Sequence, residues 1–176
     1  MSALEFYNQR LADSGQRIFA GALNGARRRG QNYVVPEHII EALGAEEDRF
    51  FQLLMSFLKI DPVQIQPLIA KRLEIFPQQA GRLRLAPVTI ALLKQAWEMA
   101  MLDGRMKIES FDLILALAND PAGVLIESLR ELNADAGAAA ATIRALVRCA
   151  ERISYKLDAE KEVSVIFTYD ETAQYG

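Results

Sequence analysis

The strongest constraint on the fold is an internal repeat with an offset of 74 residues, which pairs Gly30 with Gly104 and Asp61 with Asp135. The same offset pairs further small and apolar residues without a gap: Leu11 with Leu85, Ala12 with Ala86, Ala22 with Ala96, Ala26 with Ala100, Ala42 with Ala116, Leu43 with Leu117, Leu58 with Leu132 and Ile69 with Ile143. Identities among alanines and leucines alone could arise by chance. A closing glycine and a capping aspartate in register favour a tandem duplication of residues 11–74 and 85–148.

Helix start and stop signals recur along both halves. Ser2 with Glu5 forms a capping box that opens a short helix, and Asp13 with Gln16 opens a longer one that Gly30 closes. Further helix starts are predicted at Pro36, Glu46, Asp61-Pro62, Pro87, Ser110, Asp120-Pro121 and Asp135. The irregular stretch 76–86 is predicted to link the halves. The sequence therefore predicts an all-α fold of two tandem four-helix repeats related by a pseudo-twofold axis.

The domain organisation follows from this pattern. No strand is predicted before residues 161–169, which are rich in β-branched and aromatic residues like a short strand. We expect a double-repeat domain at residues 1–150 and a tail or linker at 151–176. Each repeat is near the size at which a single core is marginal, so the two should pack together and leave a groove along their junction.

Charge and cysteine content narrow the function classes. The formal net charge is −3, which argues against a nucleic-acid partner, and the basic run at Arg27–Arg29 suits a helix C-terminus. No apolar stretch is long enough to span a bilayer, and no secretory signal is recognisable, so we expect no membrane partner. The single cysteine, Cys149, excludes an internal disulfide and suits a reducing, cytoplasmic location.

The chemistry-bearing residues predict no enzyme. His38 is the only histidine and has no partners at metal-ligand spacing, so we expect it to orient the start of its helix. Cys149 lies among apolar residues, where a free cysteine usually acts as a buried apolar side chain. Trp97 is expected in the core. We expect no catalytic residue, metal or cofactor, and the sequence contains no phosphate loop for ATP hydrolysis.

The segment from Gly30 to Leu43, with Tyr33-Val34 and Glu37-His38, resembles the signature of the Clp N-terminal repeat. Residues 104–117 resemble a degenerate second copy, with Phe111-Asp112 in place of Glu-His. The helix sequence from Leu92 to Trp97 is similar to that of type VI secretion unfoldases. The resemblance implies a chaperone-associated domain that captures substrates or adaptors for an AAA+ ring in the same polypeptide, and a sheath helix in the secretion subfamily.

Some members of this family grip a phosphorylated arginine with a threonine from each repeat and the glutamate of the Glu-His motif. The threonine positions here hold Ala12 and Ala86. In the first repeat the glutamate remains as Glu37, and we assign Glu37 to the same site as Ala12. In the second repeat Phe111 replaces the glutamate. These departures argue against phosphoarginine recognition.

The candidate binding site is a groove bordered by the first helices. Leu4, Phe6, Tyr7 and Leu11 provide more apolar surface than a short terminal helix needs, and such surface usually marks an interaction site. The alternative is that these side chains cover the first repeat, and the site then lies near Glu37 and Phe111. The corresponding functions are a peptide-binding domain of an unfoldase, or a standalone adaptor or structural oligomerisation module.

Overall fold

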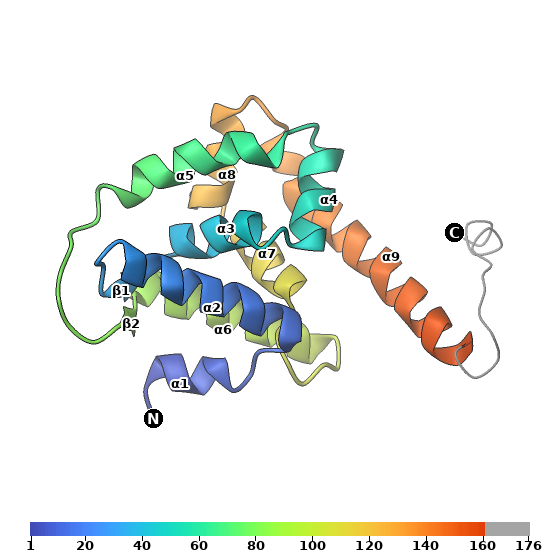
Figure 1. The fold of residues 1–176 in the computed structure, drawn as a ribbon. Coiled ribbons are helices and arrows are strands. Elements are labelled where there is room, and N and C mark those ends of the chain that lie inside the picture. Colours follow the sequence, from blue (N-terminus) through green and yellow to red (C-terminus); the bar gives the residue numbers. More distant parts are fainter. Residues whose placement is uncertain (161–176) are drawn as a thin grey trace.

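The computed structural model describes the backbone of residues 1–160 and the side chains of residues 1–149. A short helix α1 (Ala3–Asn8) precedes the first repeat, and Figure 1 shows it lying along the lower side of the molecule. The first repeat comprises α2 (Asp13–Arg28), β1 (Tyr33–Val34), α3 (Pro36–Ala45), α4 (Arg49–Phe57), the 3-10 turn η1 (Pro62–Gln64) and α5 (Ile65–Leu73). Residues 74–83 connect it to the second repeat.

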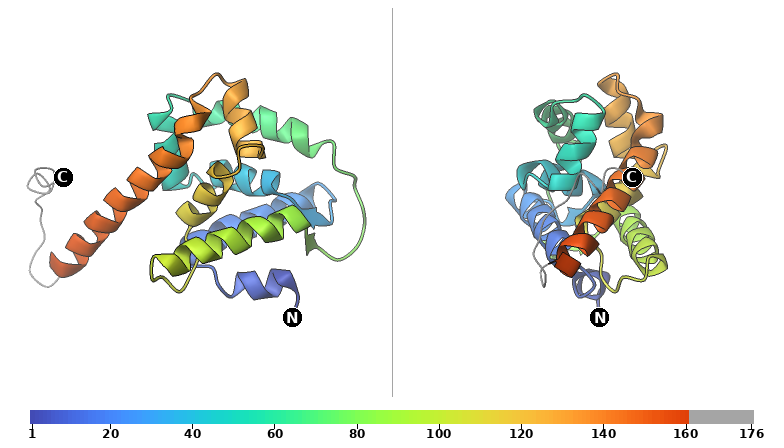
Figure 2. Two further views of the ribbon diagram at one scale, coloured as in Figure 1. Left: turned by 180° about the vertical axis from the view of Figure 1, so that it is seen from behind. Right: turned by 90° about the vertical axis from the view of Figure 1, so that its right-hand side faces the viewer.

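The second repeat begins at β2 (Arg84–Leu85) and continues through α6 (Pro87–Leu102), α7 (Ser110–Ala118), α8 (Val124–Glu131) and the 3-10 turn η2 (Ala136–Ala138). It ends in α9 (Ala139–Glu160), whose C-terminal part extends away from the other helices (Figure 2). The elements confirm the predicted all-α class and the tandem repeat, since α2 and η1 coincide with α6 and η2 when shifted by 74 residues.

Backbone conformation repeats with the same offset. Gly30 and Gly104 follow equivalent helices and have φ of 68° and 76°, the left-handed conformation that favours glycine. Lys59 and Asn133 are also equivalent, and both have positive φ, 59° and 58°. The expectation that the two glycines end equivalent helices is confirmed.

The repeats are joined by two crossed backbone contacts. β1 pairs in parallel with β2, with Val34 opposite Leu85, and a parallel bridge pairs Leu11 with Ile108. The 74-residue shift converts one contact into the other. The expectation of no strand before the tail is therefore wrong, because these two-residue strands exist only through pairing between repeats. Residues 161–169 lie outside the described part of the chain.

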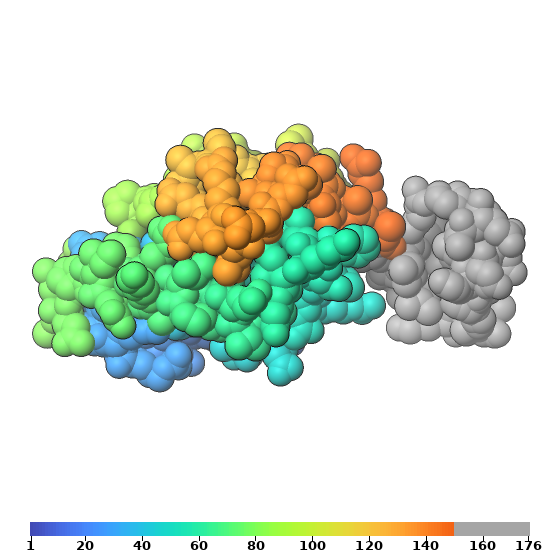
Figure 3. All heavy atoms as spheres, turned by 90° about the horizontal axis from the view of Figure 1, so that it is seen from above, coloured from blue at the N-terminus to red at the C-terminus, as the bar shows by residue number. Residues whose placement is uncertain are grey.

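The core lies between the repeats. α2 packs on α3 and α6 on α7, while α2 also contacts α7 and α3 also contacts α6. Seen from above, α5 and α8 lie side by side across the molecule (Figure 3). Ala22, Ala26, Ala96 and Ala100 are fully buried in this core.

Several helix starts differ from the expectations in detail. Ser2 accepts a hydrogen bond from the Glu5 amide, and Asp61 accepts one from the Val63 amide, as expected of caps. Asp13 and Asp135 do not cap with their side chains. The fourth helix starts at Arg49 instead of Glu46, because the buried carboxylate of Asp48 accepts from the Phe51 amide and defines the helix start.

Candidate functional site

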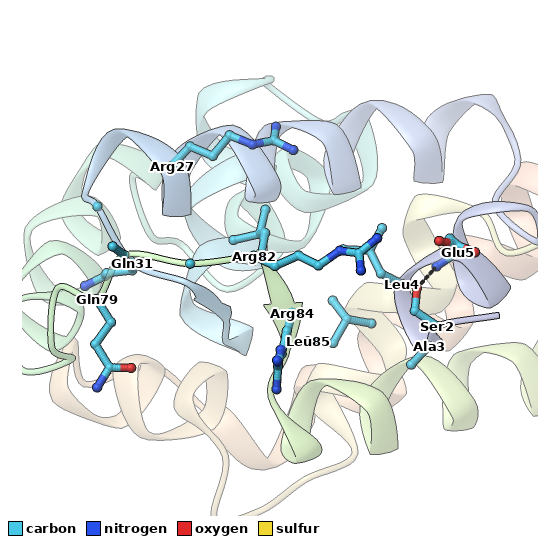
Figure 4. A pocket seen from close by; sticks show the side chains of 14 residues that line it. Ser2, Ala3, Leu4, Glu5, Arg27, Gln31, Gln79, Arg82, Arg84 and Leu85 are labelled. Atoms are coloured by element: carbon cyan, nitrogen blue, oxygen red, sulfur yellow. Dashed lines mark hydrogen bonds between the residues drawn. The ribbon is translucent and has the colours of Figure 1, made fainter.

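A groove lies between α1, the end of α2 and the connection leading into β2, and we call it the α1 groove. Its volume is about 850 Å³, and its lining comprises Ser2, Ala3, Leu4, Glu5, Arg27, Gly30, Gln31 and residues 79–85. Leu4 lies in one wall and Leu83 and Leu85 in the other. Figure 4 shows the Arg82 side chain extending from the connection toward Leu4 and Glu5 of α1.

A cluster of aromatic rings around an arginine fixes α1 to the rest of the molecule. The Arg10 guanidinium lies 3.6 Å from the ring centroid of Phe6 and 5.6 Å from that of Trp97 on α6. Arg10 also donates to the Phe6 carbonyl at 2.8 Å. Phe6 packs edge-on against Tyr7, with centroids 5.0 Å apart. These contacts hold α1 beside α6 and thereby set the position of one wall of the groove.

The opposite wall is held by hydrogen bonds of Gln31. Its side-chain amide donates to the carbonyls of Leu73 and Phe76 at 2.8 and 3.3 Å. The Gly30 carbonyl accepts from the Gln79 amide at 3.0 Å. The connection between the repeats is therefore anchored to the first repeat, which keeps the groove open between it and α1.

His38 completes this network. Its Nδ1 accepts from the Val35 amide at 3.0 Å, which leaves the proton on Nε2 to donate to Gln31 Oε1 at 2.7 Å. The ring is 1% exposed, and burial together with the nearby Arg29 charge lowers the pKa of His38 to about 4. The expected structural role at the start of α3 is confirmed.

A second groove, of about 640 Å³, lies at the junction of the two repeats, and we call it the inter-repeat groove. Its lining comes from the start of α3, the ends of α5 and α7, one face of α6 and the start of α8. Glu37 lies in this groove, and burial raises the pKa of its carboxyl group. Arg72 pairs with Glu127 and Glu131 at the same edge, both at 3.1 Å.

The structure separates the residues expected to form one site. Leu4 lines the α1 groove, and Phe6 is half-buried behind it. Tyr7 is buried and Leu11 is fully buried, so a peptide on the surface would not reach Leu11 without rearrangement. Both side chains belong to the buried core, and Leu11 pairs with Ile108 of the second repeat.

Glu37 and Phe111 lie in different places. Glu37 lines the inter-repeat groove together with Ala86, whereas Phe111 packs edge-on against Phe50 at 5.0 Å and lies under the Arg105 guanidinium. The amide of Ala12 donates to Ile108 at 2.8 Å, next to the helix that carries Phe111. The assignment of Glu37 to the site of Ala12 is therefore wrong, because the pairing of the repeats is crossed.

Two further expectations can be checked on the described residues. Cys149 is exposed on α9, so its expected burial is wrong: it lies on the outer side of the helix, whereas the nearby Val147 is buried. Trp97 is half-buried and packs against the core.

Within the described part of the chain, no cluster of histidine, cysteine or acidic side chains is arranged to hold a metal ion. None of the helices in that part combines the length and hydrophobicity needed to cross a membrane.

Sequence reasoning missed most of the α1 groove. Arg82, Arg84 and the leucines beside them belong to a stretch that reads only as a connection, and Arg27 reads as part of a basic helix end. The signal that could have revealed the groove is the alternation of arginine and leucine at residues 82–85, because a purely flexible linker needs neither residue type.

Comparison with known proteins gives one family match. The sequence model of the family described as the Clp repeat (R) N-terminal domain matches residues 10–132. No curated protein sequence matches the chain significantly.

Solved structures match over most of the chain. The N-terminal domain of the ClpV1 ATPase from the E. coli EAEC Sci1 T6SS is 30% identical, with a TM-score of 0.63, covering 70% of this chain and 77% of that one. A chain in a structure described as a peptide from the EAEC T6SS Sci1 SciI protein is 29% identical, with a TM-score of 0.65 and coverage of 73% and 82%. A complex of the ClpV N-domain with VipB peptide is 16% identical, with a TM-score of 0.59 and coverage of 72% and 81%, and it shares the fold.

Proposed function

Since the chain belongs to the Clp repeat N-terminal domain family, we propose that it is a protein-binding domain that captures a peptide segment for a Clp-type AAA+ unfoldase. The observation that carries the proposal is the open α1 groove. A volume of about 850 Å³ suits a short segment of polypeptide, and both walls offer leucine side chains. The domain itself acts by binding, and ATP hydrolysis belongs to the motor that receives the captured segment.

The segment we propose is a helix of a type VI secretion sheath. Two of the solved structures that match the chain, at 30% and 29% identity, are described as coming from the Sci1 type VI secretion system, and the description of one names a peptide of the SciI protein. An amphipathic helix can place its apolar side chains in a groove between two walls, a common mode for helical receptors. Leu4, Leu83 and Leu85 would receive those side chains.

The arrangement assigns different roles to the remaining candidate residues. Phe6 and Tyr7 position α1 through the contacts around Arg10, and Leu11 anchors the following segment by pairing with Ile108. Because the interface is small, binding should be transient, with a dissociation constant on the order of micromolar. Weak capture allows the segment to be released to a motor.

The test is a titration of a fluorescently labelled SciI peptide against the wild type, Leu4→Asp and Leu83→Asp, which alter opposite walls of the groove. We expect each variant to weaken binding at least tenfold, because a carboxylate would be desolvated against an apolar face. Leu102→Asp is the matched control, since Leu102 is 86% exposed at the end of α6 and lines neither groove.

Circular dichroism of each variant checks the fold. Unchanged affinity in both groove variants, with the helical spectrum intact, would contradict the proposal and would favour the inter-repeat groove as the binding site.

A further inference from the structure

The α1 groove carries an excess of positive charge in a chain whose formal net charge is −3. Arg27, Arg82 and Arg84 line it, against a single carboxylate from Glu5. All four side chains belong to exposed residues. A local charge opposite in sign to that of the whole chain needs a specific explanation, because it is not a by-product of composition.

These arginines are not used to hold the fold together. The ion pairs formed within residues 1–149 involve Arg17, Arg29, Arg72 and Arg105, and none of them involves Arg27, Arg82 or Arg84. Arg27 donates only to the side chain of Asn24, at 3.2 Å. The guanidinium groups of the groove therefore remain available to an incoming partner.

The inter-repeat groove has the opposite charge. Glu37, Asp120 and Glu127 line it together with Arg72, which is already paired with Glu127. The two grooves of one domain thus differ in sign, so a charged segment that suits one is repelled from the other.

The geometry points to an acidic amphipathic helix as the partner of the α1 groove, an inference that rests on the proposed function. We propose that apolar side chains of the helix lie against Leu4, Leu83 and Leu85 while Asp or Glu residues beside them pair with Arg82, Arg84 and Arg27. Arginine binds carboxylates through two parallel N–H donors, which fixes the orientation of the helix as well as attracting it.

The experiment compares three synthetic helical peptides with the same leucine face and with glutamate, glutamine or lysine at the flanking positions. Fluorescence anisotropy is measured at about 50 and 300 mM NaCl, because exposed ion pairs weaken as salt screens them. We expect the glutamate peptide to bind about tenfold more tightly than the glutamine peptide at low salt, and the lysine peptide to bind most weakly.

The variant R82Q/R84Q should abolish the advantage of the glutamate peptide over the glutamine peptide. Its matched control is K94Q/R148Q, which removes two positive charges from exposed residues that line neither groove. The control should retain the advantage of the glutamate peptide.

The outcomes separate this inference from the function on which it rests. Equal binding of all three peptides, abolished by Leu4→Asp, would overturn the acidic partner and leave the peptide groove in place. Binding of none of them would overturn the acidic partner, and the proposed function would fail as well only if the SciI peptide also did not bind. A short DNA duplex that bound better than the glutamate peptide, and lost affinity in R82Q/R84Q, would also overturn the inference, because phosphate would then be the preferred anion.

Discussion

His38 donates a hydrogen bond from Nε2 to the side-chain oxygen of Gln31 at 2.7 Å, and this neutral pair has a charged counterpart in the second repeat. The 74-residue shift converts His38 to Asp112 and Gln31 to Arg105, which form an ion pair. Both His38 and Asp112 are 1% exposed, and each accepts a backbone amide at the start of its helix. Duplication has preserved the contact while its chemistry changed.

The neutral pair predicts a pH dependence of stability. The His38 pKa is about 4 in the folded chain and about 6.5 when unfolded, so between these values the unfolded state binds a proton that the folded state does not. The contribution of His38 to stability is therefore full above pH 6.5 and declines as the pH falls toward 4, by up to about 3 kcal/mol.

Two measurements check this dependence. As the chain has one histidine, its ring signals in proton NMR need no assignment by mutation and should show a neutral ring at pH 5. Urea unfolding should show the stability difference between the wild type and His38→Gln shrinking as the pH falls from 7 to 4.5. A ring that titrates near pH 6.5 would contradict the expected burial effect.

The charged pair predicts a large loss on removal of one partner. Asp112→Ala leaves the half-buried Arg105 without this carboxylate and the Glu109 amide without its acceptor, so we expect about 3 kcal/mol of destabilisation in urea. Asp103→Ala is the matched control. Its carboxylate also pairs with Arg105 but is 52% exposed, and its loss should change stability by less than about 1 kcal/mol. Similar losses for both variants would contradict this ranking.

Gly104 offers a test of the left-handed backbone at the end of α6. No atom outside its immediate neighbours lies within 4 Å of where a Cβ would be, so the effect of a side chain is conformational. Gly104→Val should lower the unfolding free energy by about 1–2 kcal/mol, while Gly104→Asn should lose less, because asparagine tolerates this conformation. Equal melting temperatures for Gly104→Asn and Gly104→Val would indicate that the backbone relaxes to negative φ.

Trp97 distinguishes core packing from a binding role. It is half-buried, so Trp97→Ala should lose about 2 kcal/mol, less than the 3–5 kcal/mol typical of a fully buried aromatic. Met101→Ala, on the same helix and 54% exposed, is the control and should change stability by less than about 0.5 kcal/mol. A thermal melt of Trp97→Ala that matched the control would assign the ring to a surface site.

The sequence predicts the repeats well because their signals are local. Gly30 and Gly104 mark helix ends through their own backbone angles, and Pro36 and Pro87 mark helix starts through a missing amide hydrogen. β1 and β2 carry no such signal, since two residues have no periodicity and their pairing joins segments about 50 residues apart.

The candidate site was harder to predict because it also depends on contacts between segments that lie far apart in the sequence. The burial of Leu11 depends on its partner Ile108, and the approach of Arg82 to α1 depends on how the connection is anchored by Gln31. Exposed arginines in an irregular stretch have no pattern that predicts their neighbours. Only the tertiary arrangement shows that they share a groove.

The crossed pairing of Val34 with Leu85 and of Leu11 with Ile108 has a consequence for the origin of the chain. A polypeptide with one repeat could make neither contact within itself, yet two copies could make both at once about a twofold axis, as an isologous homodimer does. Gene duplication and fusion would turn that symmetric dimer into one chain. Once fused, each half was free to diverge, so that the His38–Gln31 pair of the first repeat is neutral and the equivalent Asp112–Arg105 pair of the second is charged.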